Sequence, residues 1–271
     1  AGDSPGPVWS GAREYASSPE TWPLSCTGST ATWYRHRVLL CGGASQGEES
    51  HVLVHELDVS STQWAWLPAT GEPLPKARCG HACVVIARSL WLLGGEGLRT
   101  KTPLPFEPFV LDLDTHRWRV PALAGPGPRP GPLAWHVAAV YSDRYILLFG
   151  GSTASSSCSA GLFVLDAESC EWLEIRVEGG VPAPGARSGH AGAVLGHHWF
   201  IVGGGNDKAA LADTFALDLS DLASAKVVRW VRVCDGAAGA VASEGLSVVA
   251  LPALGVLVAF GGHSAKGLHS D

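Results

Sequence analysis

The stretch RSGHAGAVLGHHWFIVGGGNDKAALADTFALDLSDLASAKVVRWVRV (residues 187–233) contains four short apolar runs divided by turn residues. The second run ends in glycines, the third ends at Asp218, and the fourth surrounds Trp230. Short runs rich in β-branched and aromatic residues, bounded by Gly, Asn, Asp and Ser, are typical of β-strands joined by tight turns. The stretch therefore predicts four consecutive strands.

The same order of features repeats along the whole chain. The glycine pairs that end the second strand are Gly42-Gly43, Gly94-Gly95, Gly150-Gly151, Gly204-Gly205 and Gly261-Gly262, at intervals of 52, 56, 54 and 57 residues. The third strands end at Asp58, Asp112, Asp166 and Asp218, and the fourth contain Trp66, Trp118, Trp172 and Trp230. Four short strands in each period of roughly 50 residues indicate an all-β fold, a kelch-type β-propeller of four-stranded blades.

We expect one propeller domain over residues 1–271, with blade units at about 24–71, 77–122, 133–178, 187–233 and 243–271. The last unit ends before a tryptophan strand, and residues 5–16 contain Trp9 without a preceding glycine pair. The two partial units could complete each other and remove exposed sheet edges, which gives four whole blades and one composite blade. The alternative is a larger ring, six-bladed, of which this chain carries only a part.

The composition argues against several classes of protein. With 19 Lys and Arg against 25 Asp and Glu, and no basic block, the chain lacks the positive surface that binds nucleic acids. The apolar runs are too short to span a bilayer, and the polar start AGDSPGPVWSG (residues 1–11) is unlike a signal peptide. The seven cysteines form an odd set without a CxxC pair, so we expect reduced thiols and a cytoplasmic protein. The absence of any Met suggests a piece of a longer chain.

Candidate catalytic and metal-binding motifs are weak. Cys79 and Cys83 are spaced as CxxxC but have no second ligand pair, and GxSxG and GxxxxGK[ST] patterns do not occur. His81, His136 and His190 recur at the start of the first strand, and position-matched repetition favours a structural role over metal binding. We therefore expect no cofactor, no metal and no catalysis.

The stretches YSDRYILLFGGS (residues 141–152), SGHAGAVLGHHWFIVGGGNDK (residues 188–208) and ASEGLSVVALPALGVLVAFGGHSAKG (residues 242–267) resemble the last repeats of the kelch-containing acyl-CoA-binding proteins of plants and algae. That resemblance implies a cytosolic protein of lipid handling with protein partners. The family's helical acyl-CoA-binding domain has no counterpart here, because no segment has a long 3.6-residue period. The resemblance therefore implies acyl-CoA binding only through a domain absent from this chain.

The remaining hypothesis is a protein-interaction scaffold whose loops on one propeller face meet a partner. The candidate residues precede the first strand or follow the glycine pairs: Arg78, Arg187, Glu96, Ser152, Asn206, Asp207, Glu244 and His263, with Glu244 in the arginine's position of the final blade. Each could instead bind a neighbouring blade, because loop residues serve both purposes. We expect Arg78 and Arg187 to lie on the same side of the ring. The alternative function is a kelch enzyme or small-ligand binder with a site at the channel mouth, similar to galactose oxidase or to the specifier proteins, although the ligand patterns of both are missing.

Overall fold

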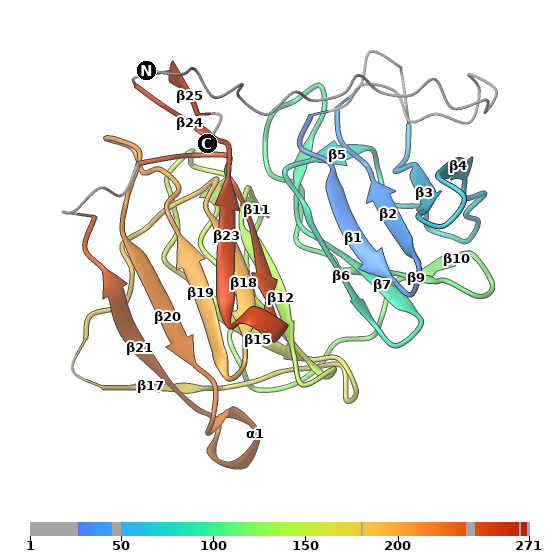
Figure 1. Ribbon diagram of the computed structural model, residues 1–271. Helices are drawn as coiled ribbons and strands as arrows, with labels where there is room; N and C mark the ends of the chain where they lie inside the picture. Colours follow the sequence, from blue (N-terminus) through green and yellow to red (C-terminus); the bar gives the residue numbers. More distant parts are fainter. Residues whose placement is uncertain (1–26, 45–49, 180, 237–241, 266, 270–271) are drawn as a thin grey trace.

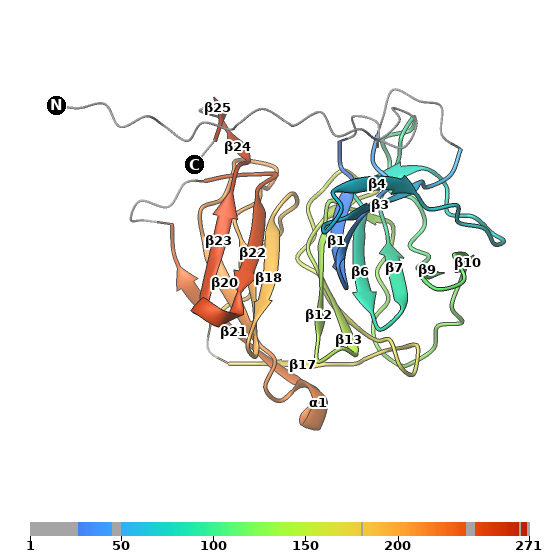
Figure 2. The same cartoon turned by 45° about the vertical axis from the view of Figure 1, so that its right-hand side comes forward.

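The computed structural model describes residues 27–44, 50–179, 181–236, 242–265 and 267–269. These residues fold into successive antiparallel sheets that stand side by side around an axis (Figures 1 and 2). The innermost strand of each sheet contacts the innermost strand of the next, in the order β1, β6, β12, β18, β22. The fold is therefore the all-β kelch propeller that the repeats predict, and we number its sheets as blades 1 to 5.

The first three blades are four-stranded sheets with the strands in chain order from the axis outward. Blade 1 consists of β1 (Thr30–Tyr34), β2 (Arg37–Cys41), β3 (Val54–Asp58) and β4 (Gln63–Trp66); blade 2 of β6 (Ala82–Ile86), β7 (Ser89–Leu93), β9 (Phe109–Asp112) and β10 (Arg117–Arg119); blade 3 of β12 (Val137–Tyr141), β13 (Tyr145–Phe149), β15 (Leu162–Asp166) and β16 (Glu171–Trp172).

Blade 4 has four equivalent strands and one additional strand, and the described part of blade 5 has two strands. Blade 4 consists of β18 (Ala191–Leu195), β19 (His198–Val202), β20 (Thr214–Asp218) and β21 (Val227–Cys234), with α1 (Leu222–Ala225) between the last two and β17 (Arg176–Glu178) parallel to β21; blade 5 consists of β22 (Ser247–Leu251) and β23 (Val256–Phe260), joined by a 3-10 turn at Pro252–Leu254. The short pairs β5 (Arg78–Cys79) with β8 (Glu96–Gly97), β11 (Leu133–Ala134) with β14 (Ser152–Thr153), and β24 (His263–Ser264) with β25 (Gly267–Leu268) lie at one end of the blades. The proposed completion of blade 5 by residues 5–16 lies outside the described residues.

The tryptophans of the fourth strands pack each blade against the preceding one. Trp118 lies in one buried cluster with Leu39 of blade 1, and Trp172 shares a cluster with Trp91 of blade 2. Trp230 packs edge-on against Phe149 of blade 3, with 5.3 Å between the ring centroids. Large apolar faces at equivalent positions thus supply much of the contact between blades.

The assignment of Trp66 to this series is wrong. Trp118, Trp172 and Trp230 are the cross-strand partners of the leucine just before the turn aspartate, and the residue in that register in blade 1 is Trp64, opposite Leu57. Trp66 pairs with His55, and 53% of its surface is exposed. The error arose because two tryptophans stand two residues apart on the same face of one strand, so spacing alone did not separate them.

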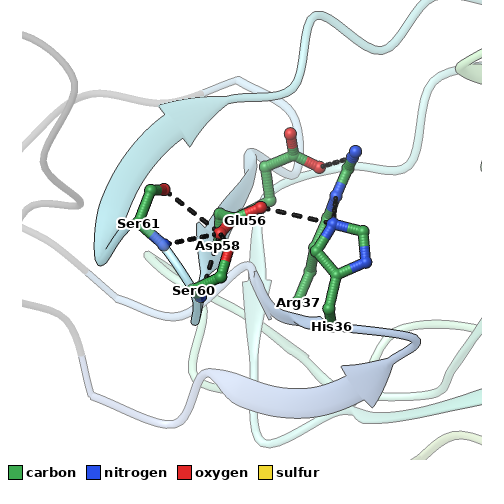
Figure 3. A network of polar contacts seen from close by, with 6 residues as sticks. All are labelled: His36, Arg37, Glu56, Asp58, Ser60 and Ser61. Carbon is green, nitrogen blue, oxygen red and sulfur yellow. Dashed lines mark hydrogen bonds and ion pairs between the residues drawn. The ribbon is translucent and has the colours of Figure 1, made fainter.

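The turn aspartates have the predicted role. Asp58 Oδ1 accepts hydrogen bonds from the backbone N–H groups of Ser60 (3.0 Å) and Ser61 (2.9 Å), and Figure 3 shows this network with the His36 and Arg37 side chains. Hydrogen bonds from Ser60 and Ser61 hold the pKa of the Asp58 carboxyl well below its usual range. Asp112, Asp166 and Asp218 accept the same kind of backbone bond at the equivalent turns. Such local bonding is why short acidic side chains are favoured there.

Candidate functional site

One end of the blades is held together by a chain of backbone hydrogen bonds between equivalent residues. The N–H of Gly80 donates to Gly28 O (3.0 Å), Trp135 to Gly80 O (2.6 Å), Gly189 to Trp135 O (3.0 Å), and Gly245 to Gly189 O (2.8 Å). These bonds connect all five blades just before the innermost strands begin. We call this end the glycine face, and it comprises these five residues, the residues directly before them, and those that follow the glycine pairs.

Trp135 differs from the other four members of the chain of bonds. All five have a positive φ, between 57° and 68°, which glycine adopts without steric cost. For a tryptophan the same backbone conformation costs on the order of 1–2 kcal/mol. The indole covers two of the glycines: a Cβ added at Gly80 would lie 2.7 Å from Trp135 Cε2, and one at Gly28 would lie 3.0 Å from Cη2.

The indole is also accessible to solvent, with 38% of the Trp135 surface exposed. A large aromatic residue held in an unfavourable backbone conformation and left open to solvent points to a binding role, because strain of this kind collects at functional sites. The repeat contained a signal for it: where three other blades have Gly-His or Gly-Leu before the first strand, blade 3 has Trp-His. Trp135 was not among the site residues predicted from the sequence.

Arg78 and Arg187 lie at equivalent positions on this face, as expected, but both side chains are buried. In each case Nε donates to the backbone oxygen two residues earlier, and an Nη1 donates to a glycine oxygen of the same blade, Gly94 (2.9 Å) or Gly203 (3.0 Å). Arg187 also forms a two-pronged ion pair with Asp213, at 2.6 and 3.1 Å. The two buried arginines therefore stabilise the backbone of the glycine face through these hydrogen bonds. Their contact with a partner stays a prediction.

These contacts also correct two alignments between blades. In blades 1 to 4, the second glycine of the pair donates its N–H to a backbone oxygen of the next blade. The acceptor is the residue three positions before the histidine or leucine that precedes the innermost strand: Gly43 bonds to Arg78, Gly95 to Leu133, Gly151 to Arg187, and Gly204 to Ser243. The pair in blade 4 is therefore Gly203-Gly204, not Gly204-Gly205. Ser243, not Glu244, occupies the arginine's position in blade 5.

Other candidate residues lie in short β-bridges on the glycine face. Glu96 pairs with Cys79, Ser152 with Ala134, and His263 with Glu244, each as a short antiparallel bridge. Glu244 lies over Gly205, where an added Cβ would overlap its carboxyl group. Glu96, Ser152 and Glu244 are half-buried and His263 is exposed, so all four side chains are at least partly accessible to solvent on this face.

Asn206 and Asp207 follow Gly205 in the same region. Asn206 Oδ1 accepts the N–H groups of Lys208 (2.9 Å) and Ala209 (3.0 Å), so this side chain shapes its own turn, whereas Asp207 is exposed. Burial raises the pKa of the nearby Cys158 thiol, and the carboxylates of Asp207 and Glu244 raise it further. Asp207 and Glu244 thus place carboxylates in this part of the face, beside the exposed Lys208.

The repeated histidines pack between blades, as the repetition predicted. Each imidazole lies against the first glycine of the preceding blade's pair: His81 against Gly42, His136 against Gly94, and His190 against Gly150. Burial lowers the pKa of both His136 and His190 to about 3, with a smaller effect of neighbouring His81 on the former and of Arg187 on the latter. Both are therefore neutral structural groups at physiological pH.

Comparison with known proteins supports the repeat assignment. Residues 80–271 match the family model described as the KLHDC2/KLHL20/DRC7 Kelch-repeats domain, and the chain belongs to this kelch-repeat family. Acyl-CoA-binding domain-containing proteins 4 and 5 of Arabidopsis thaliana are each 34% identical, over 92% and 88% of this chain but only 36% and 35% of their own lengths. Kelch domain-containing protein 3 of Homo sapiens is 31% identical over 64% of this chain and 47% of its own length. The chain thus spans about a third of the length of these two Arabidopsis thaliana relatives.

Among the described residues, we find no helix with the length and apolar character needed to cross a membrane.

Proposed function

We propose that this kelch domain is a non-catalytic protein-interaction module that binds a partner segment on its glycine face, with Trp135 as the central contact. The observation that carries the proposal is the exposed indole of Trp135, held at a φ of 57° where four other blades use glycine. Tryptophan is among the residues that contribute most to binding energy at protein interfaces. The kelch family supports an interaction role, since its propellers are protein-interaction domains.

The charges of the glycine face favour a particular kind of partner segment. Asp207 and Glu244 contribute carboxylates to this face, whereas the guanidinium of Arg187 is buried and paired with Asp213. A segment with an arginine or lysine side chain suits this arrangement, because a cation stacks favourably on an indole and is attracted by carboxylates. An acidic segment, which exposed arginines would have favoured, fits the face less well.

The test compares peptide binding by the wild-type chain and by Trp135→Gly. A displayed peptide library is selected on the wild-type chain, and the enriched peptides are measured against both proteins. Trp135→Gly installs the residue that the other blades use, so the fold is retained, and we expect at least about 30-fold weaker binding, in line with loss of a central hot spot. Trp66→Gly removes an exposed tryptophan from an outer strand and serves as the matched control, with affinity unchanged.

Equal binding by wild type and Trp135→Gly would overturn the assignment of the site. Selection of peptides without cationic residues would overturn the proposed partner chemistry, while leaving Trp135 as the contact. Gly80→Ala gives a second variant, because the added methyl group displaces the indole that lies over this glycine.

We further propose that the domain belongs to a cytosolic protein of the kelch acyl-CoA-binding type that takes part in lipid handling. The support is the pair of Arabidopsis thaliana relatives named as acyl-CoA-binding proteins, which match nearly all of this chain. Acyl-CoA would then bind through a separate domain, and the kelch domain would select the protein partner. Sequencing the complete transcript tests this proposal, and a transcript without an acyl-CoA-binding domain would contradict it.

A further inference from the structure

Two cysteines and a histidine meet in the buried space between blades 1 and 2. Cys41 ends β2, and its cross-strand partner Thr30 begins β1. His81 directly precedes β6 and Cys83 is the second residue of that strand, so their side chains point to the same side. The contact between β1 and β6 brings these two pairs together across the blade boundary.

The three side chains come close enough to share one ion. One ligand atom from each of Cys41, His81 and Cys83 lies within 4.8 Å of the other two. His81 Nε2 lies 3.1 Å from the backbone oxygen of Cys41 and 3.3 Å from Thr30 Oγ1, so a hydroxyl oxygen stands beside the cluster. His81 Nδ1 is buried without a hydrogen-bond partner. Cys41 and His81 are buried and Cys83 is half-buried.

The equivalent interfaces show that the cysteines are not needed for packing. His81, His136 and His190 have the same position against a glycine of the preceding blade. The residues that correspond to Cys41 and Cys83 are Leu93 and Ala138 between blades 2 and 3, and Phe149 and Gly192 between blades 3 and 4. His136 and His190 therefore keep this packing role without cysteine neighbours, whereas His81 has two thiols at the corresponding positions.

We propose that Cys41, His81 and Cys83 bind one Zn²⁺ between blades 1 and 2, with the Thr30 hydroxyl on the side of the fourth coordination position. Thiolate and imidazole are the ligands that zinc prefers, in a tetrahedral arrangement. The two thiolates balance the charge of the Zn²⁺ ion. The occupied site is therefore neutral, which avoids the cost of a buried net charge. Binding releases the two thiol protons to solvent and changes no oxidation state.

This proposal differs from the expectation of no metal, which came from the spacing of Cys79 and Cys83. In the structure only Cys83 of that pair belongs to the cluster. The Cys79 thiol instead donates a hydrogen bond to Glu96 Oε1 at 3.6 Å on the glycine face. The ligand that completes the set, Cys41, lies 40 residues before His81 in the chain and belongs to another blade. No spacing rule connects it with the other two.

The experiment is a metal titration of the reduced, metal-free chain. Zn²⁺ is added in the presence of a chromophoric chelator, and Co²⁺ is added separately to detect thiolate charge-transfer absorption in the near ultraviolet. We expect one equivalent of either ion per chain and an increase in thermal stability with zinc. Cys83→Ala copies the residue of the next interface, so it should fold, and zinc affinity should fall at least about 100-fold because an inner ligand is lost.

Cys79→Ala is the matched control, since it removes a neighbouring buried thiol and should leave the zinc affinity unchanged. Absence of stoichiometric zinc binding by the reduced wild-type chain would overturn the proposal, as would equal affinity in Cys83→Ala. A Cys41–Cys83 disulfide in air-oxidised protein, together with no zinc binding after reduction, would identify the pair as a redox couple and would also overturn it. None of these outcomes affects the role of Trp135, whose indole lies over Gly28 and Gly80 on the glycine face and is not one of the proposed ligands.

Discussion

Strands β13 and β23 occupy the same place in their blades and have similar sequences, YILLF and VLVAF, yet their environments are opposite. Every residue of β13 is buried, whereas four of the five residues of β23 are exposed. The phenylalanines at their ends show the contrast most clearly: Phe149 is 0% exposed and Phe260 is 54% exposed.

The difference comes from neighbours. β13 pairs with β12 and with β15, and Phe149 contacts His190 and Trp230 of the next blade. Within the described residues, β23 pairs with β22 alone, and no following blade covers it. An apolar strand thus acquires its burial from the blade that comes after it, in agreement with the nearest-neighbour stability of repeat proteins.

Replacement of the two phenylalanines gives the largest expected effect. Phe149→Ala should lower the free energy of unfolding by about 3–5 kcal/mol, because it removes a fully enclosed ring. Phe260→Ala should change it by less than about 0.5 kcal/mol, because the ring is exposed. Urea denaturation followed by tryptophan fluorescence measures both.

Equal losses in the two variants would contradict the comparison. That outcome would mean that Phe260 is covered in solution by a part of the protein outside the described residues. Val258→Ala, also on the exposed face of β23, would then show a comparable loss and would locate the covering contact.

Lowering the pH should destabilise the packing of blades 3 and 4 more than that of blade 5. His136 and His190 have pKa values lowered to about 3, while blade 5 has Leu246 at the same position. Between pH 6.5 and 3 the unfolded chain binds protons that the folded chain does not, so stability falls as pH falls through this window and is constant above it. At pH 5 the loss is about 2 kcal/mol for each histidine.

The matched variant is His136→Leu, which copies blade 5. It should keep the fold and make the unfolding free energy less dependent on pH between 7 and 5, as measured by urea denaturation at several pH values. A pH dependence as steep as that of the wild type would show that His136 is not held neutral in the folded chain.

A smaller effect is expected at the turn aspartates, which blade 5 lacks among its described residues. Asp166 is buried, and it accepts bonds from Arg144 and from the backbone N–H groups of Glu168 and Ser169. Asp166→Ala should cost about 1–2 kcal/mol through the lost hydrogen bonds. Asp114→Ala removes an exposed partner of Arg88 and should cost less than about 1 kcal/mol. Thermal unfolding of both variants ranks them, and a reversed order would show that the turn bonds contribute little.

The repeats allowed the strands to be predicted but left their registers uncertain by one or two residues. Three consecutive glycines in blade 4 offered two possible pairs, and only the bond from Gly204 to Ser243 selected the first. Trp64 and Trp66 offered two possible anchors, and only the pairing of Leu57 with Trp64 selected the former. In both cases the ambiguity was between chemically equal neighbours, which local propensity cannot distinguish.

The sequence by itself determined the strand order and the turn aspartates, because each depends on residues within one repeat. The repetition of the histidines at one position also indicated their shared structural role. The tertiary structure alone decided which candidate side chains are accessible: it buried Arg78 and Arg187 and left Trp135 exposed at a strained backbone position. It also brought Cys41 to His81 and Cys83 from another blade. Contacts between blades join residues that are distant in the chain, and only the relative placement of the blades determines them.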